Sequence, residues 1–194
     1  FQQAVGINAV LYYAPRIFQD MGMGNPMVQT VIMGVVNISF TLVAVFTVEK
    51  LGRKPLLILG SIGMAVGALG VALTFGNAAL STVTMISIMV YSASFMFSWG
   101  PIAWVLIAEL FPNTIRGAAV AIAVAFQWIF NFIVSSTFVP MFNMHLTPGD
   151  DFGHWFTYGL YGVICILAAI FVWKLVPETK GKTLGDMSKL WRKE

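Results

Sequence analysis

Long apolar stretches separated by short polar connections run through the whole chain. Six of them come close to the roughly 20 residues that an α-helix needs to cross the hydrocarbon core of a membrane. They lie at residues 1–18, 28–48, 56–75, 83–110, 118–142 and 155–176, and a tail follows at 177–194. The pattern therefore predicts an all-α membrane protein with six transmembrane helices in a lipid bilayer.

The composition supports this class and excludes a soluble domain. Of the 194 residues, 58% are hydrophobic and only 10% are charged, whereas a soluble domain carries about 25% charged residues. Every Lys and Arg except Arg16 lies near residues 50–54, at residue 116 or from residue 174 onward. With six spans these positions share one face, which the positive-inside rule assigns to the cytoplasm. We expect a multi-pass protein of the cell membrane with a cytoplasmic C-terminus, whose charge of +3 reflects topology and not nucleic-acid binding.

The first apolar stretch contains several polar groups. Gln2, Gln3, Asn8 and Tyr12 lie within its first dozen residues, and an unpaired amide in hydrocarbon costs roughly 2–7 kcal/mol. Gly6 lies between them and lets the helix bend or unwind. These groups therefore need polar partners at membrane depth.

The fourth stretch carries a second interruption. The segment "SWGPIAW" places Gly100 and Pro101 in its middle with Trp104 nearby, and a proline inside a helix removes a backbone hydrogen bond. Irregular backbone at this depth survives only against protein or water. Interruptions in the first helices of two three-span units are typical of a binding site in transporters built from repeats.

Two further stretches add uncharged polar groups. Asn37 lies on a polar face of the second stretch, and Gln127, Asn131 and Ser135 follow helical spacing in the fifth, with Trp128 beside Gln127. Amides both donate and accept hydrogen bonds, as hydroxyls require, and aromatic faces stack on sugar rings. The set favours a neutral polyhydroxylated ligand, although a single Asn or Gln often only joins neighbouring helices.

Other patterns favour structural interpretations. Gly63 and Gly67 form a GxxxG pair that predicts close helix packing and not a dinucleotide loop. His145 and His154 flank a connection that is more simply a solvated loop than a metal site. Cys165 is the single cysteine and excludes an internal disulfide. Without a catalytic triad or paired carboxylates facing a common cleft, we expect no enzyme, no metal and no cofactor.

Several segments, in one order, resemble the sugar porters of the major facilitator superfamily. They are "FQQAVGINAVLYYAP", "EKLGRKPL", "SWGPIAWVLIAELFPNTIRG", "AFQW" and "PETKGKTL". The likeness covers essentially the whole chain. It implies two inverted three-helix repeats that form the C-terminal half of a twelve-helix fold, with the N-terminal half absent.

The resemblance also implies which side chains bind substrate. In this family the corresponding positions line the sugar cavity, so we expect the amides to lack protein partners because a monosaccharide is their partner. The implied substrate-binding residues are Gln2, Gln3, Asn8, Tyr12, Asn37, Gly100, Trp104, Gln127 and Trp128.

A set of charged residues outside the apolar stretches has a different implied role. In sugar porters the matching residues form an ion network that holds the outward-open state. Here they are Arg53, Glu109 and Arg116, with Glu49 and Glu178 as plausible members. An unpaired acid such as Glu109 at a membrane boundary is expensive.

The function implied by the resemblance is secondary transport of a monosaccharide by alternating access, with D-xylose–proton symport as the first expectation. A proton-independent facilitator and a carrier of hexoses or polyols are alternatives, and a membrane sugar sensor is a further one. The residues that decide proton coupling in this family fall outside the chain. The sequence leaves the identity of the sugar and the oligomeric state open.

Overall fold

The computed structural model describes residues 1–20, 25–111, 113–147 and 151–181. Its helices are α1 (Ile7–Asp20), α2 (Pro26–Leu51), α3 (Arg53–Thr74), the short 3-10 helix η1 (Ala78–Leu80), α4 (Ser81–Phe97), α5 (Trp99–Leu110), α6 (Arg116–Phe142) and α7 (Phe152–Leu175). The described residues form helices and connections only, so the predicted all-α class is confirmed.

Among the described residues, five helical stretches are long and apolar enough to cross a membrane, and they correspond to the second through sixth predicted spans. Their ends differ from the predicted ends by three residues or fewer. The first span was predicted to be helical from residue 1, and this is wrong because α1 begins only at Ile7 and has 14 residues. Of the predicted tail, residues 177–181 are non-helical, and 182–194 lie outside the described residues.

The ends of α2 follow from local sequence. Asn25 precedes the helix, and its side-chain oxygen accepts a hydrogen bond of 2.9 Å from the Met27 N–H, which satisfies one of the free donors of the first turn. Pro26 occupies the first helical position, where its missing N–H has no consequence. At the other end Gly52 has φ +93°, a conformation that glycine adopts without steric penalty. The chain therefore reverses within one residue and enters α3.

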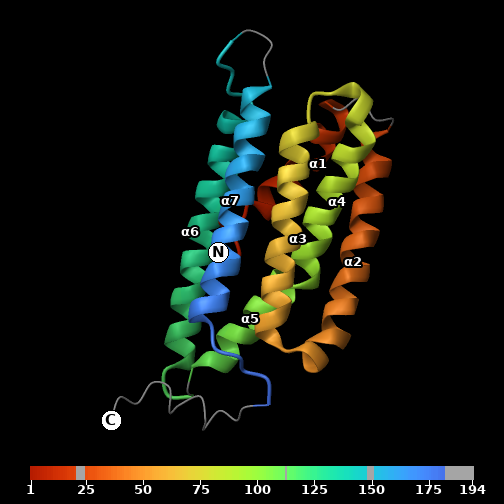
Figure 1. Cartoon of the computed structure of the whole chain (residues 1–194). Coiled ribbons are helices and arrows are strands. Elements are labelled where there is room, and N and C mark those ends of the chain that lie inside the picture. The colour runs from red at the N-terminus through yellow and green to blue at the C-terminus, as the bar shows by residue number, and fades with distance from the viewer. Residues whose placement is uncertain (21–24, 112, 148–150, 182–194) are drawn as a thin grey trace.

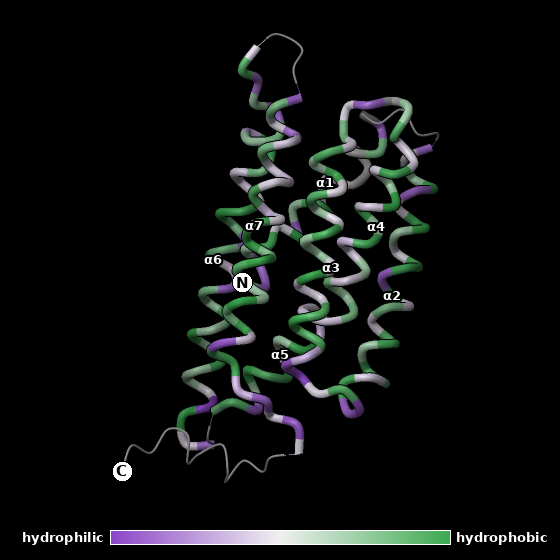
Figure 2. The backbone as a smooth tube through the Cα atoms, viewed as in Figure 1, coloured by the Kyte–Doolittle hydropathy of each residue, from purple (hydrophilic) through white to green (hydrophobic). Residues whose placement is uncertain are grey.

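The helices run roughly alongside one another (Figure 1), and α3 lies at the centre of the bundle. It packs mainly against α7 and α4, while α2 packs on α4 and α1 contacts α2, α6 and α4. Figure 2 shows hydrophilic residues concentrated in the connections at both ends and hydrophobic residues along the helices. This distribution is the one that a bilayer requires, because only the helix ends reach water.

The structure confirms the close helix packing that the GxxxG pair of Gly63 and Gly67 predicts. A Cβ atom on Gly67 would lie 2.7 Å from the Tyr91 backbone nitrogen and 2.8 Å from the Ser87 carbonyl oxygen, and one on Gly63 would meet the Ser94 side chain. Gly67 therefore has no room for a side chain, and a side chain at Gly63 would displace that of Ser94. Helices α3 and α4 therefore approach each other nearly backbone to backbone.

The described basic residues of the predicted cytoplasmic face gather at one end of the bundle. The α2–α3 turn, the start of α6 and the segment after α7 lie together at the lower end in Figure 1. They carry Lys50, Arg53, Lys54, Arg116 and Lys180. At the opposite end the α6–α7 connection leads into α7.

His154 at this opposite end is packed between aromatic rings and is not a loop residue. Its ring centroid lies 4.3 Å from that of Phe75 and 4.2 Å from that of Phe142. Its Nδ1 atom lies 3.3 Å from Asp151 Oδ1. Through these contacts His154 joins the start of α7 to the ends of α3 and α6. No group of three or more His, Cys, Asp or Glu side chains arranged for a metal ion occurs in the described part of the chain.

Candidate functional site

Residues 1–6 cross the centre of the bundle without forming a helix. Gly6 has φ +89°, and the segment turns on itself through hydrogen bonds of 3.1 Å from Val5 N to Phe1 O and from Gly6 N to Gln3 O. The interruption predicted at Gly6 is thereby confirmed. A tight turn that contains Gln2 and Gln3 replaces the regular helix there.

The second interruption lies at Ser98, upstream of the predicted Gly100–Pro101 pair. Ser98 has φ −130° and ψ −85°, and α4 ends before it while α5 begins after it. Gly100 and Pro101 fall in the first turn of α5, where backbone N–H groups have no intrahelical partner and a proline removes nothing. The location predicted for the break is therefore wrong by two to three residues, since the proline starts the second helix and does not interrupt a continuous one.

Gln2 connects the two interruptions. Its side chain is buried, with 6% of its surface exposed, and its Nε2 donates to the carbonyl oxygens of Trp99 at 2.9 Å and Gly100 at 3.2 Å. Its Oε1 accepts a hydrogen bond from Gln127 Nε2 on α6. One amide therefore joins the irregular segment, α5 and α6.

A second group of amides lies beside the first. Asn8 Nδ2 donates to Gln3 Oε1 at 2.6 Å and to Asn131 Oδ1 at 3.0 Å, and Ser135 Oγ lies 3.5 Å from the same Asn131 oxygen. The expectation that these amides lack protein partners is wrong. They bond to one another across α1 and α6, because amides in an apolar bundle must satisfy their hydrogen-bonding groups.

The pairing still leaves hydrogen-bonding capacity on the wall of a cavity. Among the described residues, no group accepts from Gln3 Nε2 and none donates to Gln127 Oε1. Both residues and Gln2 line a cavity of about 320 Å³, a size at the lower end of the range for small-molecule sites. Aromatic rings of Trp99, Phe126 and Phe130 also line it. Gln3 with a free donor, Gln127 with a free acceptor, and aromatic side chains therefore line one partly open cavity.

Other residues expected at the site lie elsewhere. Asn37 lines a separate cavity of about 280 Å³ and accepts a 2.7 Å hydrogen bond from Ser92 Oγ. Tyr12, Trp104 and Trp128 are 59%, 45% and 65% exposed on this chain and do not line the cavity that contains Gln2. The structure thus groups Gln2, Gln3, Asn8, Gly100 and Gln127 and leaves the remaining four residues outside this group.

Sequence reasoning did not assign two residues that the geometry brings to the site. Trp99 contributes its carbonyl oxygen and its ring, and its Nε1 donates to Ser61 Oγ on α3 at 2.7 Å. Asn131 accepts from Asn8. The polar spacing of α6 already contained the signal for Asn131, which lies one turn after Gln127. No spacing signal distinguishes Trp99 from Trp104, because the break decides which indole faces inward.

A charged cluster at the basic end of the bundle centres on Arg53. Its Nε lies 3.1 Å from Glu109 Oε2 and its Nη2 lies 2.7 Å from Glu109 Oε1, which makes a bidentate pair. Nη2 also lies 3.0 Å from Glu49 Oε1. Thr179 Oγ1 donates to Glu109 Oε2 at 2.6 Å. The Arg53 side chain is only 9% exposed, so this cluster neutralises a charge that is largely removed from water.

Arg116 and Glu178, the other expected members, make different contacts. Among the described residues Arg116 donates only to the Phe111 carbonyl, at 3.3 Å. The Glu178 carboxylate accepts from the backbone N–H groups of Arg53 and Lys54, both at 3.0 Å. Glu178 therefore caps the N-terminus of α3, where anions are favoured by the helix dipole.

The environment of Glu178 fixes its ionisation. Partial burial by itself raises the pKa of this carboxyl, but backbone N–H donors from Lys180, Arg53, Lys54 and Thr179 favour the ionised form, and the net result is a lowered pKa. The ionised Glu178 carboxylate stabilises the folded state. This contribution is complete above the pKa of an unfolded glutamate, about 4.3, and is lost as the pH falls through the lower pKa of the folded state.

Replacing Glu178 with glutamine should therefore reduce stability in a pH-dependent way. We expect the full-length protein to lose about 1 kcal/mol at pH 7, as for the loss of a helix cap, because the amide keeps one acceptor oxygen but no charge. Melting temperatures of both proteins in detergent between pH 3.5 and 8 check this. The difference between them should be constant above pH 6 and shrink below about pH 4. A difference that persists unchanged at the lowest pH contradicts the assignment.

The comparison with known families identifies the chain. A family model described as "Sugar (and other) transporter" matches residues 1–191. The chain belongs to the sugar porter family. The family is one of transporters and not of enzymes, which agrees with the expectation from the sequence.

Curated sugar porters match along the whole chain. The D-xylose-proton symporter of Escherichia coli (strain K12) is 50% identical over 196 residues, covering 100% of this chain and 40% of that protein. The glucose facilitated diffusion protein of Zymomonas mobilis is 41% identical over 196 residues, covering 100% of this chain and 41% of that protein. The chain thus spans about two fifths of the length of these relatives.

Solved structures of a sugar porter share this fold. The major facilitator superfamily proton:xylose symporter XylE bound to 6-bromo-6-deoxy-D-glucose superposes with a TM-score of 0.87 at 49% identity, covering 99% of this chain and 41% of that chain. The inward-open conformation of the E. coli xylose transporter XylE gives a TM-score of 0.84 at 49% identity, covering 99% and 40%. The chain therefore has the fold of part of a twelve-helix major facilitator protein.

Proposed function

We propose that the chain is the C-terminal six-helix half of a secondary carrier that moves a monosaccharide across the cell membrane by alternating access. The observation that carries the proposal is the cavity wall on which Gln3 Nε2 and Gln127 Oε1 present a donor and an acceptor beside aromatic rings. Sugar hydroxyls need both kinds of partner. None of the described residues that line this cavity has a charged side chain, and this favours a neutral ligand over an ion.

The substrate residues in this proposal are the grouped amides together with the residues outside the group. Sugar hydroxyls form hydrogen bonds directly with Gln2, Gln3 and Gln127, and Asn8 orients Gln3. Tyr12, Asn37, Trp104 and Trp128 complete the site from surfaces that the second half of the carrier would cover. Gly100 contributes a carbonyl that fixes Gln2.

The charged cluster holds one conformation in the same proposal. The end of the bundle that carries Arg53 faces the cytoplasm, with the C-terminus on the same side. Arg53 and Glu109 then form the centre of the network that holds this half in the outward-open state, and its outer members are Glu49, Arg116 and Glu178. The two interrupted helices supply the local movement that alternating access requires.

D-xylose–proton symport is the proposed mode, supported by the 50% identity to a protein named for this activity. The test is transport by the full-length protein in proteoliposomes. We expect an inward proton gradient to drive D-xylose accumulation, and added D-xylose to make the external medium more alkaline. Equilibration of xylose without accumulation or alkalinisation contradicts symport. Binding without any transport contradicts a carrier and favours a sensor.

Facilitated diffusion of glucose is the second candidate, because a relative at 41% identity is named for it. The same vesicles separate the two modes. A facilitator should exchange labelled D-glucose at equal rates with and without a proton gradient.

A further inference from the structure

The segment that carries Gln2 and Gln3 is not helical and has two backbone hydrogen bonds of its own, from Val5 N to Phe1 O and from Gly6 N to Gln3 O. It lies before α1, and its amides can face the cavity only if the break at Gly6 keeps one geometry. Val5 and Ile7, on either side of Gly6, are 0% exposed. A carbonyl released from the helical ladder in such a buried place needs a donor from elsewhere.

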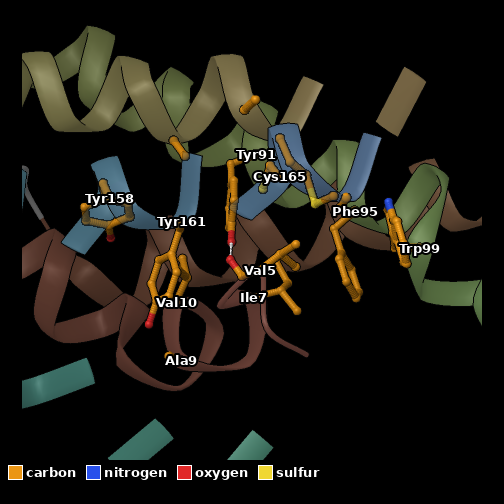
Figure 3. Close-up of a cluster of buried hydrophobic side chains, with 14 of the residues drawn as sticks. Val5, Ile7, Ala9, Val10, Tyr91, Phe95, Trp99, Tyr158, Tyr161 and Cys165 are labelled. Carbon is orange, nitrogen blue, oxygen red and sulfur yellow. Dashed lines mark hydrogen bonds between the residues drawn. The ribbon is translucent and has the colours of Figure 1, made fainter. Parts of the chain in front are cut away.

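Tyr91 of α4 supplies that donor. Its hydroxyl donates to the Val5 carbonyl oxygen, and Figure 3 shows the ring pointing from α4 directly toward this atom. The tyrosine is 1% exposed. Its own backbone is fixed in turn, because the missing side chain of Gly67 lets α3 approach within contact of the Tyr91 nitrogen. The GxxxG packing, the tyrosine and the break therefore form one continuous chain of contacts.

Tyr161 of α7 contacts the break in a different way. A Cβ atom on Gly6 would lie 2.6–2.7 Å from three carbons of the Tyr161 ring, so the ring packs flat against the glycine. The Tyr161 hydroxyl is buried and has no hydrogen-bond partner among the described residues. Tyr161 thus acts through its ring, whereas Tyr91 acts through its hydroxyl.

We infer that Tyr91 is a positioning residue of the sugar site, which fixes the Val5 carbonyl and thereby the direction of Gln2 and Gln3. The inference rests on the proposed function for its effect on sugar affinity. Without the hydroxyl, the buried carbonyl must seek another donor and the turn at residues 1–6 samples other geometries. Apparent affinity falls in proportion to the fraction of molecules that keep the competent geometry.

The test compares two identical substitutions at the same break in the full-length carrier. Tyr91→Phe removes the hydrogen bond and keeps the ring, whereas Tyr161→Phe removes a hydroxyl that has no hydrogen-bond partner among the described residues and serves as the matched control. We expect calorimetric titration with D-xylose to give a dissociation constant about tenfold higher for Tyr91→Phe and within about twofold of wild type for Tyr161→Phe.

A second readout separates positioning from general stability. Hydrogen–deuterium exchange of a peptide covering residues 1–10 should be faster in Tyr91→Phe than in wild type or Tyr161→Phe, while peptides from α3 and α7 exchange as before. Faster exchange in every peptide identifies a general loss of stability and overturns the inference. Wild-type affinity and wild-type exchange in Tyr91→Phe overturn it as well.

The two hypotheses fail in distinguishable ways. If wild-type protein binds neither D-xylose nor D-glucose, the proposed function fails. The exchange comparison then still decides whether Tyr91 holds the segment. If wild type binds D-xylose and Tyr91→Phe binds it equally well, the proposed function stands and the role of Tyr91 is refuted.

Discussion

Replacing Gln2 with alanine should abolish measurable sugar binding by the full-length carrier. The substitution removes the amide that joins the irregular segment to the Trp99 and Gly100 carbonyls and to Gln127. It leaves buried polar groups unpaired and removes a proposed contact to the sugar, and sites built on hydrogen bonds lose affinity steeply in this situation. We expect the dissociation constant for D-xylose to rise roughly 30-fold or more, measured by calorimetry.

Gln19→Ala is the matched control for this prediction. Gln19 is an exposed glutamine on α1, so removing its amide should leave affinity unchanged within about twofold. Trp104→Ala, at a residue that does not line the cavity of this chain, tests the wider site. Wild-type affinity in Gln2→Ala would refute the site assignment. Wild-type affinity in Trp104→Ala would restrict the site to the grouped amides.

Replacing Glu109 with alanine should destabilise the charged cluster and shift the full-length carrier toward the inward-facing state. The Arg53 side chain is 9% exposed and that of Glu109 is 30% exposed. Loss of the acid leaves a largely buried guanidinium without its bidentate partner. We expect a loss of about 2–4 kcal/mol, somewhat less than for a fully buried pair. The measurement is the rate of cysteine labelling at positions introduced on either side of the cavity, together with the melting temperature.

Glu49→Ala provides the control, because this carboxylate pairs with the same Arg53 atom but is 73% exposed. An exposed pair of this kind contributes about 0.2–1 kcal/mol, so labelling should change little. Equal labelling patterns in wild type and Glu109→Ala would contradict a role of the cluster in holding the outward-open state. Equal effects of both substitutions would contradict the central place of Glu109.

The members of the charged cluster were predicted from the sequence, but their contacts were predicted only in part. The resemblance implied five members, and Arg53, Glu109 and Glu49 indeed lie in contact. Glu178 lies beside them but binds the backbone at the start of α3, which a list of charges does not reveal. The roles of all five residues in the conformational cycle remain predictions.

The sequence by itself determined the class of the fold and the approximate limits of the long helices. The length of a hydrophobic stretch and the positions of glycine and proline are local properties. They predict where a chain in a bilayer forms helices, whatever the packing between these helices. The sequence also placed one interruption at Gly6, since only glycine accepts φ +89° there without strain.

Only the tertiary structure decided how the polar groups pair. Gln2 and the Trp99 carbonyl are 97 residues apart in sequence, and Gln2 and Gln127 are 125 apart, so no periodicity links them. The break at Ser98 and the tyrosine hydroxyl on Val5 likewise depend on how closely α3 and α4 approach. The physical reason is that a buried amide or carbonyl must be satisfied by whichever group the packing brings within about 3 Å, and packing is a property of the whole bundle.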